Sequence, residues 1–340
     1  MALTKIIIIT HEFPPFHGGA GVYCEELAKA LQRGGRIVEV WVPRWPGSLR
    51  LRHLVPFAWQ VWCRRMELCD CTVLLGSRGA HMIFMALPIK TGKLVSLLHG
   101  SELVRYGRRL RRLLNRVHCV IVPSNFTGSL VPKAIQKIVA VPAPCAAAMR
   151  PVTDSQPHAG IRILTLARLH PRKGQLDVAR ALALLPAKYR QAVTYQVGGT
   201  GQRAYLQEVE QTCRAAGVAF ECLGSIPADR LAATYAQCDI FVMTSRLLKN
   251  SVEGFGIAFL EASFHGKPVI GYRSGGESEA VLNGETGWLV DEADVPAVAA
   301  IIERLIADPV LRQKIGDRGR EHARQFSWDR AASIITAAID

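Results

Sequence analysis

The sequence of 340 residues predicts an α/β protein made of two domains, each a parallel sheet covered by helices on both faces. Short apolar segments alternate with amphipathic helical ones along most of the chain, and this alternation is typical of parallel sheets. The alternation weakens between residues 141 and 157, where prolines and polar residues predict a linker. The length also exceeds the roughly 250–300 residues at which a single core stops growing, so two cores are expected.

The first domain is expected to span residues 1–150. A helix is predicted from Val22 to Arg33, because Tyr23, Leu27 and Leu31 fall on one face and Gly34 follows in the position of a C-cap. The predicted strands of this domain are the apolar segments 5–10, 36–42, 72–75, 93–98 and 117–122.

The second domain is expected to span residues 158–325, followed by a separate segment, 326–340. The last third of the chain is helical in pattern: Pro296 stands near the start of an amphipathic helix over residues 295–306, and Ser327–Ile339 is amphipathic as well. The predicted strands of this domain are 161–166, 193–197, 218–222, 239–244 and 268–270.

The formal net charge of +14 is confined to the first half of the chain. Residues 1–150 contain 21 Lys or Arg against seven Asp or Glu, whereas residues 151–340 contain 21 of each kind. A positive field in one half indicates a polyanionic partner for that half, which is nucleic acid, an anionic membrane surface or a phosphorylated acceptor.

The nine cysteines are scattered and lack the spacing of a four-ligand metal site, so we expect reduced thiols that mostly fill small core positions. The N-terminal apolar run, Ile6–Ile9, is too short for an export signal. No segment approaches the ~20 apolar residues that span a bilayer. The expected location is the cytoplasm, with peripheral contact at the inner face of the cytoplasmic membrane.

Two motifs of the first half follow predicted strands. Gly18, Gly19 and Gly21 open the helix after the first strand, where exposed backbone N–H groups suit a phosphate. The alternative is a tight turn without a ligand. His99 lies just past the strand 93–98, at the edge that faces ligands in open α/β sheets, although a lone histidine is commonly structural.

Comparable motifs occur in the second half. Arg168, Arg172 and Lys173 stand in the turn after the strand 161–166. Cations at this edge suit a diphosphate, and a solvated basic turn is the alternative. The glycine-containing turns 198–201 and 274–279 follow other predicted strands, and they either line the same edge or only reverse the chain.

The most specific feature is a pair of carboxylates, Glu253 and Glu261, around a glycine-marked helix start. Gly254 and Gly256 keep the backbone bare there, so phosphate oxygens can accept from the N–H groups of the first turn. Glu261 has apolar neighbours in the sequence, and a buried carboxylate needs a partner. We therefore expect Glu253 to accept from sugar hydroxyls and Glu261 to accept from a ribose diol.

These motifs together resemble family 4 of the retaining glycosyltransferases, which have the two-domain GT-B fold. The resemblance extends over nearly the whole chain and rests on E-G-F-G-x-x-x-x-E at Glu253–Glu261, followed by P-V-I at 268–270 and G-G-x-x-E at 275–279. It implies two doubly wound Rossmann-like domains that face each other across a deep cleft. The second domain would bind the nucleotide sugar, the first would bind the acceptor, and residues 326–340 would pack back on the first.

The resemblance also implies roles for individual residues. His99, Arg168, Lys173 and Glu253 would form the catalytic set, with the two cations neutralising the leaving diphosphate and His99 over the transferred sugar. The donor would be bound by Gly18, Gly19, Arg168, Lys173, Glu253, Phe255, Gly256, Ile257, Ala258 and Glu261.

The implied reaction transfers a hexose or N-acetylhexosamine, with retention, from a nucleotide-diphosphate sugar to a glycan or lipid-linked acceptor in cell-surface polysaccharide or glycoconjugate synthesis. UDP-sugars are expected first and GDP-mannose second. No Asp-x-Asp motif occurs, so a metal-independent reaction without a cofactor is expected. The loop 247–252 departs from the family pattern and leaves the sugar open.

Two arginine-rich stretches carry the charge of the first domain. One surrounds the apolar segment 54–62, and the other, Val104–Arg116, has Leu110, Leu113 and Leu114 on one helical face. A basic amphipathic helix is typical of membrane-surface elements, so the second stretch is the expected acceptor or membrane surface. A solvated basic face is the alternative. The arginines concerned are Arg105, Arg108, Arg109, Arg111 and Arg112.

Other functions remain open on this evidence. A GT-B enzyme of different chemistry, such as an epimerase, would turn over the donor without an acceptor. The basic charge also suits a protein that binds nucleic acid or membrane. No nucleic-acid motif occurs, however, and that function leaves Glu253 and Glu261 unexplained, so no nucleic-acid partner is expected. Nothing supports an inactive sugar-binding regulator, because every motif position is filled.

Overall fold

The computed structural model describes residues 5–14, 18–45, 49–152 and 158–340, excluding the side chains of residues 106–108. The chain divides into two units. Unit 1 comprises Met1–Pro142, Lys249–Gly254 and Ser327–Asp340, and unit 2 comprises Ala143–Leu248 and Phe255–Phe326. Each unit contains a six-stranded parallel sheet with helices packed on it, which confirms the predicted α/β fold class.

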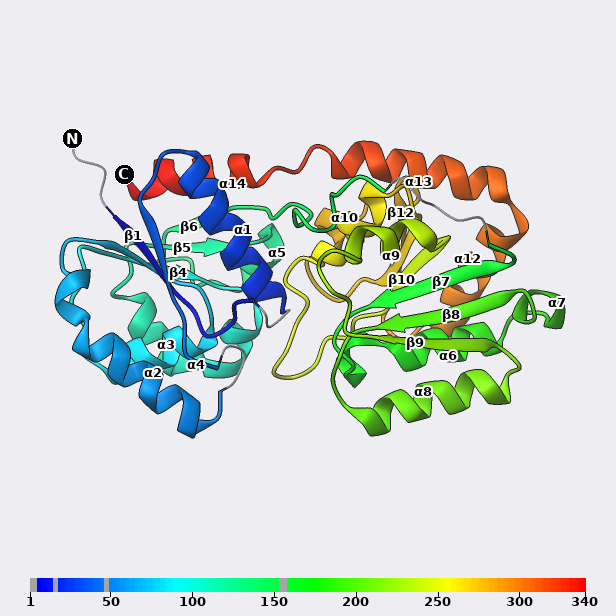
Figure 1. The fold of residues 1–340 in the computed structure, drawn as a ribbon, viewed down its shortest axis with the longest axis horizontal. Helices are drawn as coiled ribbons and strands as arrows, with labels where there is room; N and C mark the ends of the chain where they lie inside the picture. The colour runs from blue at the N-terminus through cyan, green and yellow to red at the C-terminus, as the bar shows by residue number, and fades with distance from the viewer. Residues whose placement is uncertain (1–4, 15–17, 46–48, 153–157) are drawn as a thin grey trace. The chain divides into compact units, whose positions relative to one another are not determined.

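Unit 1 has helices on both faces of its sheet (Figure 1). Alternate strand residues such as Ile7 and Ile9 share one core with α2, α3 and α4, while α1 and α14 pack together on the other face. The strands, in the spatial order β2-β1-β3-β4-β5-β6, are β1 (Ile6–Ile9), β2 (Val38–Trp41), β3 (Thr72–Leu75), β4 (Lys93–Leu97), β5 (Cys119–Val122) and β6 (Lys137–Val139). The helices are α1 (Gly19–Arg33), α2 (Leu51–Cys63), α3 (Arg78–Ala86), α4 (Ser101–Leu114), α5 (Asn125–Ser129) and α14 (Trp328–Ile339).

Unit 2 repeats this architecture with a second core, in which α6, α8 and α12 cover one face of the sheet. Its strands, in the order β12-β11-β10-β7-β8-β9, are β7 (Ile161–Leu166), β8 (Val193–Gly198), β9 (Ala219–Gly224), β10 (Ile240–Met243), β11 (Val269–Tyr272) and β12 (Gly287–Val290). Its helices are α6 (Gln175–Ala183), α7 (Ala187–Arg190), α8 (Arg203–Ala215), α9 (Leu231–Gln237), α10 (Ile257–Phe264), α11 (Glu277–Ala280), α12 (Val295–Ala307) and α13 (Pro309–Ala323).

Two strands were missed by the sequence pattern, and both lie at a sheet edge. β6 and β12 contain only three and four residues, and each pairs with a neighbour on one side only. The short, lysine-containing β6 gives a weak apolar signal, as is common for edge strands. β12 has the sequence Gly-Trp-Leu-Val and is as long as β1, so neither length nor polarity explains why it was missed. Helix α1 also begins at Gly19, earlier than the predicted Val22, because its Gly-Ala-Gly start has poor helix propensity that hides the first turn.

The first part of the predicted linker packs within unit 2. Ala143, Cys145 and Ala148 are buried. The backbone N–H of Cys145 donates to a carboxylate oxygen of Glu261 over 3.3 Å, and the Nε2 atom of His265 lies 2.7 Å from the carbonyl oxygen of Ala148. These contacts make the stretch part of the core of unit 2, while residues 153–157 lie outside the described part of the chain.

The C-terminal helix α14 completes unit 1. The buried ring of Trp328 meets the ring of Tyr23 edge-on, with 5.0 Å between centroids. Arg33, at the end of α1, bonds to the carboxylate of Asp329 over 2.7 Å. The apolar face of α1 is therefore covered by a helix from the opposite end of the chain.

Candidate active site

In unit 2 the sequence motifs follow neighbouring parallel strands. The chain runs from β7 to β8 on one side, and the strand on the other side of β7 is β10. Such a reversal of strand order opens a crevice at the carboxyl edge, where open α/β sheets bind ligands. The loop after β7 carries Arg168 and Lys173, and the loop after β10 leads to Glu253 and α10.

The basic turn after β7 is held directly against the end of β10. Residues Pro171–Lys173 form a 3-10 turn, and Gly174 follows with a φ of 72°. A Cβ atom at Gly174 would lie 2.0 Å from the carbonyl oxygen of Thr244, so this close approach requires glycine. The Nζ atom of Lys173 lies 3.9 Å from Sδ of Met243, the last residue of β10, and Arg168 is exposed. The turn thus places its cations at the switch point.

An ion pair with a buried carboxylate ties the loop after β10 to helix α6. Arg246 donates twice to the carboxylate of Asp177, with both N···O distances 2.7 Å. Asp177 is only 3% exposed and also accepts from the hydroxyl of Tyr272 over 3.3 Å. A bidentate pair of this kind is geometrically specific, so the loop after β10 has a defined position relative to α6.

Helix α10 begins at this edge without a side-chain cap. Its N-cap residue, Gly256, has a φ of 88°, and a Cβ atom there would lie 2.7 Å from the ring of Phe259. Phe255 is buried beside Phe326, whereas Ile257 and Ala258 are half-buried. The first turn of a helix presents N–H groups that have no partner within the helix, which suits an anion at this point.

Glu261 occupies a buried position in α10 and is hydrogen-bonded on both carboxylate oxygens. Oε2 accepts from the hydroxyl of Tyr235 over 2.7 Å, and Oε1 accepts from the backbone N–H of Cys145 over 3.3 Å. Burial and the neighbouring carboxylate raise the pKa of Tyr235 well above its usual value, so its proton stays in place as the donor. Because a carboxylate offers about four acceptor positions, Glu261 retains capacity for a ligand hydroxyl.

Two glycine-containing turns support the same edge. Gly199 and Gly201 have φ values of 128° and 157°, and Cβ atoms there would lie 2.0 and 2.2 Å from the carbonyl oxygens of Ala167 and Leu169. The turn 198–201 therefore supports the basic turn by close backbone packing. After β11, the hydroxyl of Ser274 lies 2.7 Å from a carboxylate oxygen of the fully buried Glu277.

In unit 1 the switch point lies between β1 and β3. His11, after β1, accepts at Nδ1 from the backbone N–H of Gly79 over 3.2 Å, and the hydroxyl of Ser77 lies 2.6 Å from the same atom. Gly18 is the buried N-cap of α1, and Gly19 is exposed with open space where a Cβ atom would point. The fold does not require glycine at position 19.

His99 and Glu253 belong to the same unit. The ring of His99 is 5.5 Å from the ring of Tyr23, and its Nε2 atom lies 3.1 Å from the carbonyl oxygen of Gly76. Its own carbonyl oxygen adjoins Gly254, where a Cβ atom would lie only 2.3 Å away. The segment Lys249–Gly254, which ends one residue after Glu253, is thus packed against the end of β4.

Two hydroxyl groups hold this segment. Ser124 and Thr127 both donate to the carbonyl oxygen of Gly254, over 2.6 and 3.1 Å. The hydroxyls of Ser101 and Ser251 lie 3.2 Å apart. Glu253 therefore stands on a backbone anchored by three side chains of unit 1.

Helix α4, the expected acceptor or membrane surface, turns one face to the core of unit 1 and the other to solvent. Leu110, Leu113 and Leu114 are buried in unit 1, so the apolar face of α4 is already covered. The outward residues are cations, and the side chain of Arg108 lies outside the described part of the chain. The described exposed arginines of this stretch are Arg105, Arg109, Arg111, Arg112 and Arg116.

No helix in the described ranges is both long enough and apolar enough to pass through a bilayer. Within the same ranges, His, Cys, Asp and Glu side chains form no group of three or more that would hold a metal ion.

The chain resembles known proteins over nearly its whole length. The model of "Glycosyl transferases group 1" matches residues 155–322. A GDP-mannose-dependent alpha-(1-6)-phosphatidylinositol monomannoside mannosyltransferase of Mycolicibacterium smegmatis is 30% identical, over 94% of this chain and 93% of that protein. The chain is a family 4 glycosyltransferase of group 1. Its fold is GT-B, shared with the structural neighbours described next.

Two solved structures show how closely the fold of this glycosyltransferase is matched. Sucrose-phosphate synthase from Thermosynechococcus elongatus superposes with a TM-score of 0.84 at 20% identity, covering 98% of each chain. Anabaena Alr3699/HepE, in complex with UDP and glucose, gives 0.78 at 21% identity, covering 99% of each chain. At this level of identity the likeness concerns the fold.

Each unit of the glycosyltransferase gathers its own part of the predicted site. Unit 1 holds Gly18, Gly19, His99 and Glu253, and unit 2 holds Arg168, Lys173, Phe255–Ala258 and Glu261. The sequence did not point to Tyr235, Ser124 or Thr127. Each of these residues forms a hydrogen bond to a segment that is distant in the chain, which the sequence pattern does not show. The sequence indicated only that a buried Glu261 needs a partner, without identifying Tyr235.

We expect the free energy of unfolding to decrease as the pH falls from 6.5 to 4, because burial lowers the pKa of His11 and His81 to about 4. The unfolded chain binds protons at these groups near pH 6.5 and the folded chain does not. Each histidine therefore destabilises the fold by up to about 3 kcal/mol at the acidic end. Urea unfolding of wild type and His81→Gln across this range measures the effect. The difference between them should shrink with acidification, and a constant difference would exclude this origin.

Proposed function

We propose that this protein transfers a hexose, with retention of configuration and without a metal ion, from a nucleotide-diphosphate sugar to an anionic lipid-linked acceptor. The observation that carries the proposal is the geometry of unit 2. Two cations in the loop after β7, the uncapped N-terminus of α10 and the buried, hydrogen-bonded Glu261 of the same helix follow the strands on either side of one switch point. This combination suits the diphosphate and ribose of a nucleotide.

The donor proposed first is GDP-mannose. The relative from M. smegmatis named above is described as GDP-mannose-dependent and as acting on a phosphatidylinositol monomannoside. This relationship, at 30% identity over nearly the whole chain, supports GDP-mannose ahead of the UDP-sugars that family frequency alone favours. The positive charge of the first half supports an acceptor with a phosphate group.

In the proposed reaction the bond between the anomeric carbon and the diphosphate breaks, and the acceptor oxygen bonds to the same face of the sugar. Arg168, Lys173 and the N–H groups of Ile257 and Ala258 stabilise the charge that grows on the diphosphate. A diphosphate oxygen takes the proton of the acceptor hydroxyl.

The remaining site residues are proposed to position the donor. Glu261 accepts from the ribose diol. Glu253 accepts from hydroxyls of the transferred sugar, with His99 over its ring, and Gly18 and Gly19 lie against the phosphates or the sugar.

A thermal-shift panel with GDP, UDP, ADP and their sugars tests the donor site, since a ligand that binds only the folded state raises the melting temperature. We expect a selective shift with GDP and GDP-mannose that EDTA leaves unchanged. Consumption of donor should require an acceptor lipid extract, whereas turnover without it would indicate an epimerase. A folded sample that shifts with no nucleotide would remove the proposal.

A further inference from the structure

Helix α4 supplies exposed arginines to the surface of unit 1, while its Leu110, Leu113 and Leu114 are in the core. Helix α2 is arranged differently. Leu54, Phe57 and Val61 anchor it to the same core. Its solvent-facing side carries a row of large apolar residues beside Arg52 and Gln60.

The outward side of α2 forms a regular stripe of large apolar residues. Leu51, Val55 and Trp59 are 73%, 60% and 66% exposed, and Met66, beyond the end of the helix, is 71% exposed. Residues spaced by four lie on one helical face. A soluble protein surface rarely presents a contiguous row of this kind without a partner for it.

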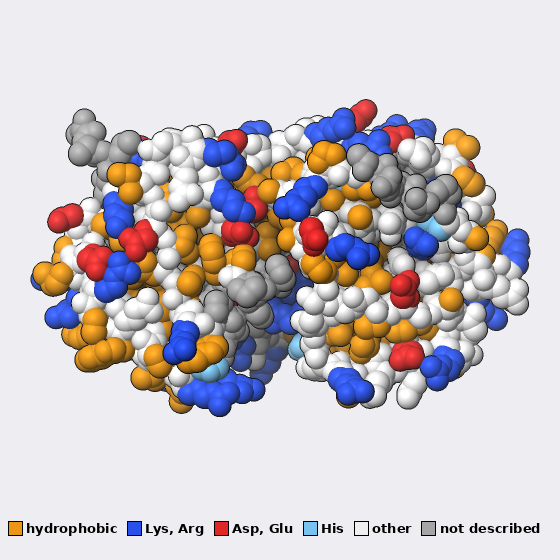
Figure 2. All heavy atoms as spheres, in the orientation of Figure 1, with side chains coloured by type: hydrophobic (Ala, Val, Ile, Leu, Met, Phe, Trp, Pro, Cys, Tyr) orange, Lys and Arg blue, Asp and Glu red, His pale blue; other side chains and the backbone are white. Residues whose placement is uncertain are grey.

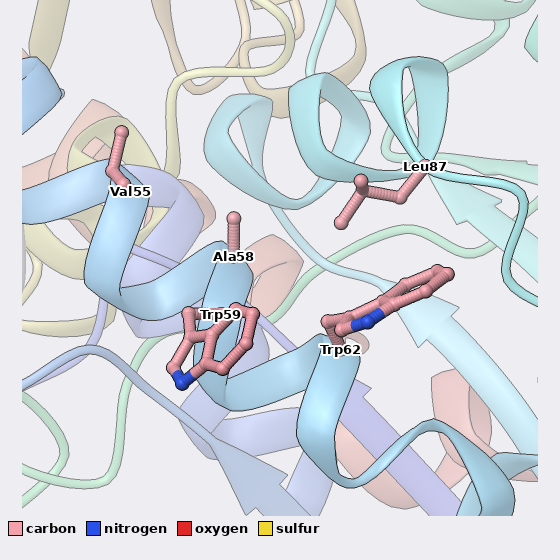
Figure 3. A pocket seen from close by; sticks show the side chains of 5 residues that line it. All are labelled: Val55, Ala58, Trp59, Trp62 and Leu87. Atoms are coloured by element: carbon pink, nitrogen blue, oxygen red, sulfur yellow. The ribbon is translucent and has the colours of Figure 1, made fainter.

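The stripe borders a shallow groove. The groove has a volume of about 270 Å³ and is lined by Val55, Ala58, Trp59 and Trp62 of α2 and by Leu87, just after α3. Figure 3 shows the side chain of Leu87 directed toward the ring of Trp62 across the groove. All five side chains are apolar in this region, so the groove suits hydrocarbon and offers little to a polar ligand.

The sequence at the rim of this surface is rich in arginine, and one of these arginines, Arg64, is paired with Glu39 and Glu67 over 2.9 and 2.8 Å. No Asp or Glu occurs between Glu39 and Glu67, and the interval contains Arg44, Arg50, Arg52, Arg64 and Arg65. The guanidinium groups of Arg44 and Arg65 lie 5.0 and 4.3 Å from the ring centres of Trp45 and Trp62. Figure 2 shows hydrophobic and Lys or Arg side chains intermixed over the part of unit 1 where Figure 1 places α2.

We propose that this surface docks on an anionic membrane leaflet, with the stripe Leu51, Val55 and Trp59 inserted among the acyl chains and the arginines at the lipid phosphates. Indole rings beside cations over an apolar face are characteristic of helices that lie in the membrane interface. A second copy of this chain fits poorly, because its arginine rim would face a rim of the same charge. An anionic membrane is a single partner that suits both features, with acyl chains for the apolar stripe and lipid phosphates for the arginines.

The inference rests on the proposed function, because docking on a membrane would bring the enzyme to a lipid-linked acceptor. Its test is independent, since binding to vesicles needs neither donor nor acceptor. We would measure co-sedimentation with phosphatidylcholine vesicles with and without 30% phosphatidylglycerol, and quenching of tryptophan fluorescence by brominated acyl chains. Wild type should bind only the anionic vesicles and should be quenched. The variant Val55→Ser/Trp59→Ser should bind at least about 10-fold more weakly, since it removes two inserted apolar side chains.

Two matched variants separate insertion from other effects. Trp59→Phe should keep most of the binding while losing much of the bromine quenching, which places residue 59 among the acyl chains. Val310→Ser, at a side chain 78% exposed on α13 of unit 2, should change neither measurement.

Three results would overturn the inference: unchanged binding by Val55→Ser/Trp59→Ser, binding without quenching, or an oligomer in wild type that this variant dissociates. In each case an intact nucleotide shift would leave the proposed function standing. If the protein binds vesicles but no nucleotide raises its melting temperature, the membrane inference stands and the proposed function fails.

Discussion

Replacing Lys173 by methionine is expected to lower kcat about 100-fold or more, with a much smaller effect on the KM for the donor. The leaving diphosphate gains charge as the sugar departs, and Lys173 stands at the end of β10, where that charge would develop. An interaction that strengthens in the transition state appears in kcat rather than in ground-state binding. Steady-state rates with donor and acceptor measure the effect.

The turn that carries Lys173 is set by Gly174 and its contact with Thr244, which the substitution leaves unchanged. Methionine also retains most of the length of the side chain, so the melting temperature should stay near that of wild type. Lys188→Met, at an exposed lysine of α7, is the matched control. A kcat for Lys173→Met within about threefold of wild type would exclude a role for this cation in the reaction.

The second large effect is expected at Glu261. Replacing it by alanine should raise the dissociation constant of GDP about 10- to 100-fold, because the proposed hydrogen bonds between the carboxylate and the ribose diol would be lost. Inorganic pyrophosphate lacks a ribose and should bind this variant as it binds wild type. Lys173→Met should weaken the binding of both ligands, because GDP and pyrophosphate both contain the diphosphate that Lys173 is proposed to bind. Isothermal titration with both ligands measures the two constants.

Glu261→Ala also removes the partner of Tyr235 and of the Cys145 N–H. A loss of stability of about 1–3 kcal/mol is therefore expected. Glu261→Gln retains an oxygen for Tyr235 and separates this effect from the loss of ribose binding. Glu208→Ala, at an exposed residue of α8, provides the surface control. Equal weakening of GDP and pyrophosphate in the Glu261 variants would show a general disturbance of the site and contradict the assignment to the ribose.

The sequence predicted those features that depend on neighbours in the chain. Gly174 and Gly256 mark positions where the backbone takes a positive φ beside a helix start, and such positions are visible as glycine in a one-dimensional pattern. The strands in the middle of each sheet were also predicted, because each is a short segment rich in apolar residues. The edge strand β6, three residues long with Lys137 among them, gave no comparable signal.

Features that depend on tertiary contacts were not predictable in this way. The leucines of α4 would have the same helical periodicity if they faced a membrane or a protein core. Only the packing in unit 1 shows that Leu110, Leu113 and Leu114 face the core. The segment Lys249–Gly254 belongs by sequence to the second half, yet Ser124 and Thr127 bind it in unit 1. Hydrogen bonds between segments that are distant in the chain produce no periodic pattern in the sequence, so they cannot be predicted from it.

The position of α14 in unit 1 has a consequence for the synthesis of the protein. Domains commonly fold in the order in which the ribosome releases them, the N-terminal one first. Here the face of α1 that packs against Trp328 stays uncovered until α14, Trp328–Ile339, has been translated. Unit 2 can be finished earlier, because it ends at Phe326. The unit that is begun first therefore needs a segment translated after unit 2, and a premature stop within codons 327–340 would spare unit 2 and leave unit 1 without α14.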